Sequence, residues 1–189
     1  DFQATLETKP EKAIKLEKDA LAQIENITAD NARLVSNLHA NLGGLYRMNG
    51  YPDLAREHME KSISLLDQFN LLHINDSIPQ IANYAMFLTE QQEPERGISE
   101  LQKLSGIIKE YHSDECLDYA KVQETLGTIY LMTANLPQAK THFKRAFKIY
   151  EKIWADEPEM IEAKYQEIQE LYPQIGFFIG KNLSGLLTK

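Results

Sequence analysis

The sequence has few of the features that define several common protein classes. It contains one cysteine, Cys116, among 189 residues, which excludes an internal disulfide framework and favours a reducing compartment. No apolar run approaches the roughly 20 residues that a membrane-spanning helix needs, and no charged-then-apolar leader opens the chain. We therefore expect a cytoplasmic protein without a membrane segment.

Basic residues are scarce relative to acidic ones. Lys and Arg total 20 against 28 Asp and Glu, which gives a formal net charge of −8. Nucleic-acid and anionic-lipid surfaces are recognised by clustered Lys and Arg, so neither partner is predicted. The hydrophobic content of 43% and charged content of 25% are values of a folded globular chain.

Motifs of catalysis and cofactor binding are missing as well. The chain has no His-Glu-x-x-His, no Cys-x-x-Cys pair and no Gly-rich phosphate loop. His112 and Cys116, which lie close to Asp114, supply too few ligands for a good zinc site, and Cys116 has no evident general base. We predict no enzyme, no cofactor and no metal.

The sequence does contain an internal repeat. Leu42-Gly43 followed by Tyr46 reappears as Leu126-Gly127 followed by Tyr130. A less well matched copy of the same pattern lies halfway between them. The period is therefore about 42 residues. Two further columns hold small residues that permit close helix packing: Ala55, Gly97 and Ala139, and Gly43, Ala85 and Gly127. Another column holds the large apolar residues Met59, Leu101 and Phe143. Prolines recur at Pro52, Pro94 and, shifted by one, Pro137.

Each unit is predicted to be a helical hairpin. Apolar residues recur at spacings of three and four, which is typical of an α-helix. A proline is tolerated in the first turn of a helix, so Pro52, Pro94 and Pro137 each begin a second helix. Gly50 suits the left-handed conformation that closes the first helix.

This pattern resembles the tetratricopeptide repeat, whose signature is Leu-Gly, Tyr, Ala, Phe and Ala at fixed offsets. The third unit matches it best, through Leu126, Gly127, Tyr130, Ala139, Phe143 and Ala146. The long period is similar to the kinesin-light-chain type of repeat. The resemblance covers roughly residues 10 to 172 and implies an all-α fold, a right-handed superhelical stack of antiparallel helix pairs, or α-solenoid.

We expect a single array over residues 1–189. Residues 10–27 would be the second helix of a truncated repeat, and residues 158–189 a partial repeat or a C-terminal cap. Three full hairpins are predicted at 31–70, 78–111 and 116–155. The expected helices span 10–27, 31–49, 52–70, 78–91, 94–111, 116–134, 137–155 and 158–172.

A stack of hairpins presents its first helices on a concave side that suits a peptide. Asn41, Asn83 and Thr125 share one column there, and an asparagine amide can both donate to and accept from a peptide backbone. Resemblance to kinesin-light-chain repeats implies a ligand role for these asparagines; helix capping or simple solvation is the alternative. The candidate groove residues are Asn37, Asn41, Arg47, Met48, Asn83, Met86, Lys121, Thr125, Thr128 and Met132.

The chemistry of the groove gives a weak preference for a ligand. Arg47 and Lys121 are the only cations expected there, too few for a clamp on acidic C-termini. An acidic chain favours a basic or neutral amphipathic peptide. Met48, Met86 and Met132 would form either an adaptable apolar floor or part of the core.

We therefore predict a non-catalytic protein–protein interaction module that binds an extended or helical peptide of a partner protein. Two alternatives stay open. One is a fragment of a peptide-pheromone-sensing regulator, since such receptors also use repeats of this kind. The other is a structural spacer or self-association domain, in which residues 174–189 form the contact.

Overall fold

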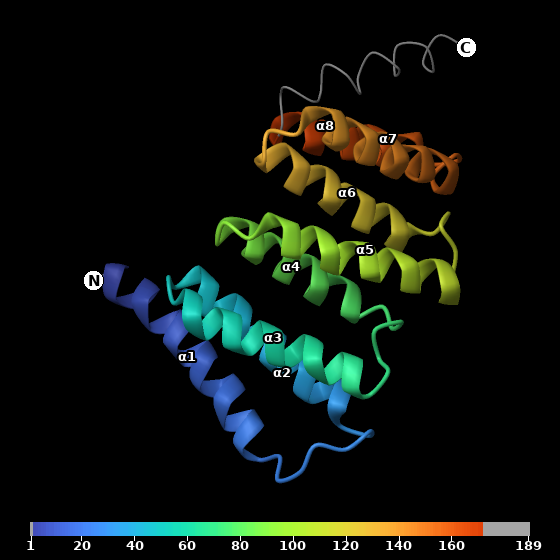
Figure 1. The fold of residues 1–189 in the computed structure, drawn as a ribbon. Helices are drawn as coiled ribbons and strands as arrows, with labels where there is room; N and C mark the ends of the chain where they lie inside the picture. Colours follow the sequence, from blue (N-terminus) through green and yellow to red (C-terminus); the bar gives the residue numbers. More distant parts are fainter. Residues whose placement is uncertain (1, 172–189) are drawn as a thin grey trace. The chain divides into compact units, whose positions relative to one another are not determined.

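The computed structural model describes residues 2–171, with side chains described for residues 10–170. This part of the chain is all-α and contains no strand, as predicted (Figure 1). Residues 174–189, for which a cap or a self-association contact was expected, lie outside the described residues. The helices are α1 (Phe2–Ala22), α2 (Ala32–Met48), α3 (Pro52–Gln68), α4 (Ser77–Glu90), α5 (Pro94–Tyr111), α6 (Leu117–Met132), α7 (Leu136–Ile153) and α8 (Pro158–Leu171).

The expected bounds of the first helix, 10–27, are wrong. α1 begins at Phe2 and passes through Pro10, which has no backbone N–H and so removes one hydrogen bond of the helix. It ends at Ala22, and the loop that follows has its own contacts. Asn31 accepts from the backbone N–H of Thr28 at 2.8 Å and donates to the carbonyl of Asn26 at 2.9 Å.

The chain divides into two compact units, residues 1–107 and 108–189. In the first unit, α2 pairs with α3 to form the first hairpin, and α4 pairs with α5 to form the second. A buried cluster joins α2, α3 and α4, and Ile14, Leu21 and Ile63 pack against it. Its members are Leu42, Tyr46, Ala55, Met59, Tyr84, Phe87 and Leu88.

The third hairpin, α6 with α7, lies in the second unit and is followed by α8. The ring of Tyr165 on α8 stacks on Phe147 of α7, with centroids 4.3 Å apart. The Tyr165 hydroxyl donates to Glu151 at 2.8 Å, and Ile168 is buried. These contacts hold α8 against α7.

Small residues bring paired helices together, as the sequence predicted. A Cβ added at Gly97 would lie 2.6 Å from the carbonyl oxygen of Ala85, and one added at Gly127 would lie 2.9 Å from the ring of Phe143. Both distances are shorter than real Cβ contacts, so glycine is required at the crossing of α4 with α5 and of α6 with α7.

The same turn closes the first helix of every hairpin. Gly50, Gln92 and Ala134 share one column of the repeat and all have positive φ, at 76°, 65° and 58°. The residue after each donates its N–H to a carbonyl five residues back, the bond of the Schellman motif. These bonds join Tyr51 to Tyr46 at 3.0 Å, Glu93 to Leu88 at 2.8 Å and Asn135 to Tyr130 at 2.7 Å.

Candidate functional site

The candidate site is a groove between α2 and α4, within the first unit. It consists of two pockets of about 470 and 350 Å³, which share Ala40, Gln80 and Asn83. Because they share these residues, the two pockets lie next to each other. The larger is also lined by Gly44, Arg47, Met48, Met59, Ser62 and Glu90, and the smaller by Asn37, Asn41, Asp76 and Pro79.

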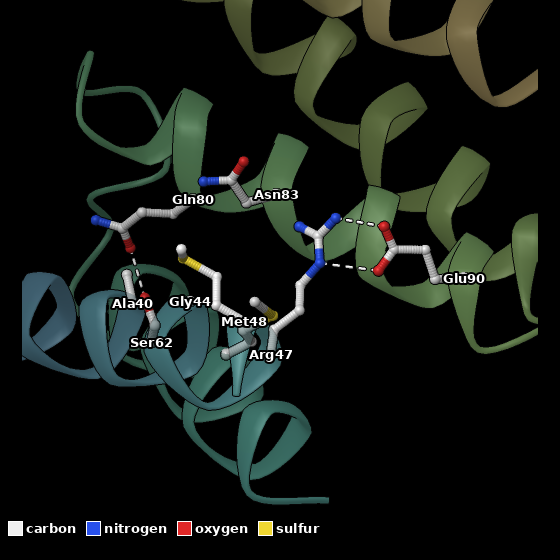
Figure 2. Close-up of a pocket in the computed structure, with 9 residues that line it drawn as sticks. Ala40, Gly44, Arg47, Met48, Ser62, Gln80, Asn83 and Glu90 are labelled. Carbon is white, nitrogen blue, oxygen red and sulfur yellow. Dashed lines mark hydrogen bonds and ion pairs between the residues drawn. The ribbon is translucent and has the colours of Figure 1, made fainter. Parts of the chain in front are cut away.

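The helical period places these side chains on one face of α2. Residues 37, 41, 44 and 48 follow one another at spacings of three and four, whereas Leu42 and Tyr46 point into the core. Figure 2 shows Ala40, Gly44 and Met48 on α2, with Gln80 and Asn83 extending from α4. A Cβ added at Gly44 would meet nothing within 4 Å, so the groove is open at this point.

A network of polar side chains forms the floor of the groove. The hydroxyl of Ser36 donates to Gln80 Oε1 at 2.8 Å, and Ser62 donates to the same oxygen. Gln80 donates in turn to Asn37 Oδ1. The Asn37 amide donates to Asp76 at 3.3 Å, so one chain of hydrogen bonds connects α2, α3 and the beginning of α4.

Ion pairs mark the two ends of the groove. Arg47 binds both oxygens of Glu90, with Nε 2.8 Å from Oε2 (Figure 2), a bidentate geometry that fixes both side chains. At the other end, Arg33 Nε lies 2.7 Å from Asp76 Oδ2. The hydrogen bonds from Arg33 and then Asn37 lower the pKa of Asp76 below its ordinary value, so this carboxylate is charged at neutral pH.

The predicted asparagines differ in what their amides contact. Asn37 is held by Asp76 and Gln80, and Asn41 donates to Glu17 of α1 at 3.0 Å. Asn83 is exposed and forms no hydrogen bond with any residue that the structure describes. Its amide is therefore available to a ligand without breaking an internal contact.

Five of the ten predicted residues line the groove: Asn37, Asn41, Arg47, Met48 and Asn83. Met48 is 84% exposed, so the interpretation of this methionine as core is wrong. Met86 is half-buried.

The other four predicted residues belong to α6 in the second unit. Lys121 pairs with Asp118 at 3.8 Å, and Thr125 donates to the Lys121 carbonyl at 2.9 Å. Thr128 is only 8% exposed, and its hydroxyl donates to the Glu124 carbonyl at 3.1 Å. Met132 is 47% exposed, so it is not core either.

Sequence reasoning missed Ser62, Gln80, Asp76 and Glu90. Gln80 lies three residues before Asn83, on the same face of a helix, and this spacing was a usable signal. The partners of Gln80 on α2 and α3 are 44 and 18 residues away, so their contacts depend on how the helices pack.

Within the described part of the chain, no group of three or more His, Cys, Asp or Glu side chains could hold a metal ion. None of the described helices is long and apolar enough to cross a membrane.

Comparison with known proteins agrees with this geometry. Residues 77–152 match the family model described as tetratricopeptide repeat. These residues are therefore similar to tetratricopeptide repeats. No curated protein matches the sequence.

Solved structures extend the same tetratricopeptide-repeat fold over most of the chain. BtubC (BKLC) from P. vanneervenii superposes with a TM-score of 0.67 at 20% identity, covering 78% of this chain and 58% of that one. The nearly identical TPR-like repeats of a Podosopora anserina protein, classed with kinesin light chains, give 0.68 at 14% identity, covering 79% and 70%. The chain thus spans little more than half the length of BtubC.

Proposed function

We propose that this tetratricopeptide-repeat chain is a non-catalytic interaction module whose α2–α4 groove binds an extended or helical peptide of a partner protein. Tetratricopeptide repeats generally mediate protein–protein interactions, and the kinesin-light-chain-like neighbours are of this type. The observation that carries the proposal is the pair of adjacent pockets between the first helices of two successive hairpins, both lined by the exposed side chain of Asn83.

The lining supports a peptide rather than a compact polar ligand. Ala40, Gly44, Met48 and Met59 give the larger pocket an apolar wall, which suits an apolar side chain of the ligand. Asn83, which lines both pockets, and Asn41, which lines the smaller one, carry side-chain amides that can donate to and accept from a peptide backbone. The pocket volume of about 470 Å³ is ample for one large side chain and part of the peptide backbone.

The net charge of the chain favours a neutral or basic peptide. Within the groove, Arg47 is neutralised by its bidentate pair with Glu90, and Asp76 is neutralised by its pair with Arg33. The chain carries a net charge of −8, which would speed the approach of a basic ligand and slow that of an acidic one. The same charge supports the prediction of a protein partner rather than a nucleic acid or an anionic membrane.

The test uses a random peptide library and two matched glycine variants. Peptides are first selected on the full chain, and their affinities are then measured for the wild type, Gly44→Leu and Gly106→Leu. A Cβ at either glycine meets nothing within 4 Å, so both substitutions should fold, but only Gly44 lies in the groove. We expect Gly44→Leu to weaken binding at least about tenfold, and Gly106→Leu to leave the affinity unchanged.

Asn83→Ala provides a second measurement that does not fill the groove. Loss of its amide should weaken the same peptides by about 1–3 kcal/mol if it pairs with the ligand backbone. Equal affinity of all the variants and the wild type would place the interface outside the α2–α4 groove. Failure to select any peptide would favour the spacer or self-association alternative.

A further inference from the structure

Two histidines face each other inside the first hairpin. His39 on α2 and His58 on α3 bring their Nδ1 atoms to 2.8 Å, and His39 is only 7% exposed. The ring of His58 also stacks on Tyr46, with centroids 5.4 Å apart. A hydrogen bond between two Nδ1 atoms needs one nitrogen with a proton and one without, so the accepting ring is neutral and at most one of the two rings can be charged in this contact.

The third hairpin has the same arrangement with one residue changed. Gln123 occupies the column of His39, and His142 occupies the column of His58. His142 Nδ1 lies 2.9 Å from Gln123 Oε1, and the His142 ring stacks on Tyr130 with centroids 5.2 Å apart. An amide oxygen accepts a ring N–H whether the imidazole is neutral or charged, so this contact survives protonation of its histidine, whereas the histidine pair does not survive protonation of both its rings.

We propose that the His39–His58 pair makes the α2–α3 hairpin acid-sensitive. Protonation of both rings leaves two N–H groups facing each other, which removes the hydrogen bond and places two positive charges in a largely buried contact. The packing of α2 on α3 then weakens, whereas His142 in the α6–α7 hairpin keeps its hydrogen bond when it is protonated, although burial and then Arg145 also lower its pKa. This acid sensitivity is a property of folding, and it holds whether or not the groove binds a peptide.

The charged groups around the pair reinforce this effect. The positive charge of Lys61 on α3 lowers the pKa of both histidines, and that of Lys18 on α1 lowers the pKa of His58. The negative charge of Glu57 acts in the opposite direction on His58. Burial is the largest cause: it lowers the pKa of His39 from 6.5 to about 4 and also lowers the pKa of His58.

The direction of the pH dependence follows from these shifts. Below pH 6.5, the ordinary pKa of histidine, the unfolded chain can bind a proton on each of the two histidines, whereas the folded hairpin cannot hold both protons. The contribution of the pair to stability is therefore complete above that pH and is lost as the pH falls toward 4.

Hydrogen exchange of the full chain tests the proposal, with the third hairpin as an internal reference. Amide protection is measured at pH 7.5 and pH 5.0 and corrected for intrinsic exchange rates. We expect protection in α2 and α3 to fall about tenfold more than protection in α6 and α7. His39→Gln gives the first hairpin the same residue pair as the third, and it should abolish this difference.

The reciprocal variant Gln123→His transfers the histidine pair to the third hairpin. With its helical content at pH 7.5 confirmed by circular dichroism, it should give α6 and α7 the acid sensitivity of α2 and α3. An equal fall of protection in both hairpins of the wild type would overturn the proposal. So would an unchanged difference in His39→Gln, or an unchanged pH response of α6 and α7 in Gln123→His.

Discussion

At one column of the repeat, the backbone conformation is the same in all three hairpins although the residue type differs. Gly50, Gln92 and Ala134 occupy one column and share the left-handed conformation, although only glycine adopts it without a steric penalty. The hydrogen bond from the following residue holds the chain in this turn in all three hairpins. The protein therefore accepts a local cost at Gln92 and Ala134 to keep the geometry of the turn.

Relieving that cost should stabilise the third hairpin. We expect Ala134→Gly to raise the free energy of unfolding by about 0.5–1 kcal/mol, because glycine has no Cβ to clash at φ 58°. Urea denaturation followed by circular dichroism measures the change. Gly50→Ala is the matched control and should lower stability by a similar amount. A lower stability for Ala134→Gly would show that the methyl group packs favourably in the turn.

The sequence predicted residue conformation and helix faces better than side-chain pairing. Gly50 and the outward face of α2 follow from short-range patterns, so both could be predicted. The pairing of Asn41 with Glu17, 24 residues away, and of Asn37 with Asp76, 39 residues away, could not. Such pairs depend on the exact crossing of α1, α2 and α4, which residue spacing along one helix does not specify.

At the scale of elements, the helices of the hairpins begin with different caps. α7 begins after Asn135, whose side chain accepts from the backbone N–H of Gln138. α6 begins after Cys116, whose sulfur accepts from the N–H of Tyr119 at 3.4 Å. Sulfur is a weak acceptor, whereas serine is among the best residues at this position. The N-terminus of α6 is therefore capped less well by Cys116 than it would be by a serine at this position.

Cys116→Ser should stabilise α6 with almost no change in shape. The backbone of Cys116 is already extended, with φ −93° and ψ 162°, as an N-cap residue requires. We expect the free energy of unfolding to rise by about 0.5–1 kcal/mol, together with slower amide exchange in the first turn of α6. Cys116→Ala removes the acceptor and should have the opposite effect. If the serine variant is no more stable than the alanine variant, the cap contributes nothing.

Helix bounds show which local signals decide where an element ends. Proline and glycine place the beginning of α3 and the end of α2 closely, because both residues restrict or permit specific backbone angles. The same signal failed at Pro10, which lies inside α1. At the other end, α1 stops at Ala22, and the loop after it is held by the contacts of Asn31, which the spacing of apolar residues does not reveal.

For the whole molecule, a repeat architecture predicts that a destabilising substitution affects mainly the hairpin that carries it. Each hairpin of a repeat array has its own core and contacts only its neighbours in sequence. Leu126 is 1% exposed in the third hairpin, and Leu126→Ala should cost about 2–5 kcal/mol as a buried large-to-small change.

Hydrogen exchange shows how far that loss extends. We expect Leu126→Ala to lower protection strongly in α6 and α7 and much less in α2 and α3, because these hairpins lie in the separate compact units 108–189 and 1–107. Leu42→Ala, at the same column of the first hairpin, is the matched control and should reverse the pattern. An equal loss over all the helices in both variants would mean that the array unfolds as one cooperative unit, in which case stability belongs to the whole chain rather than to its hairpins.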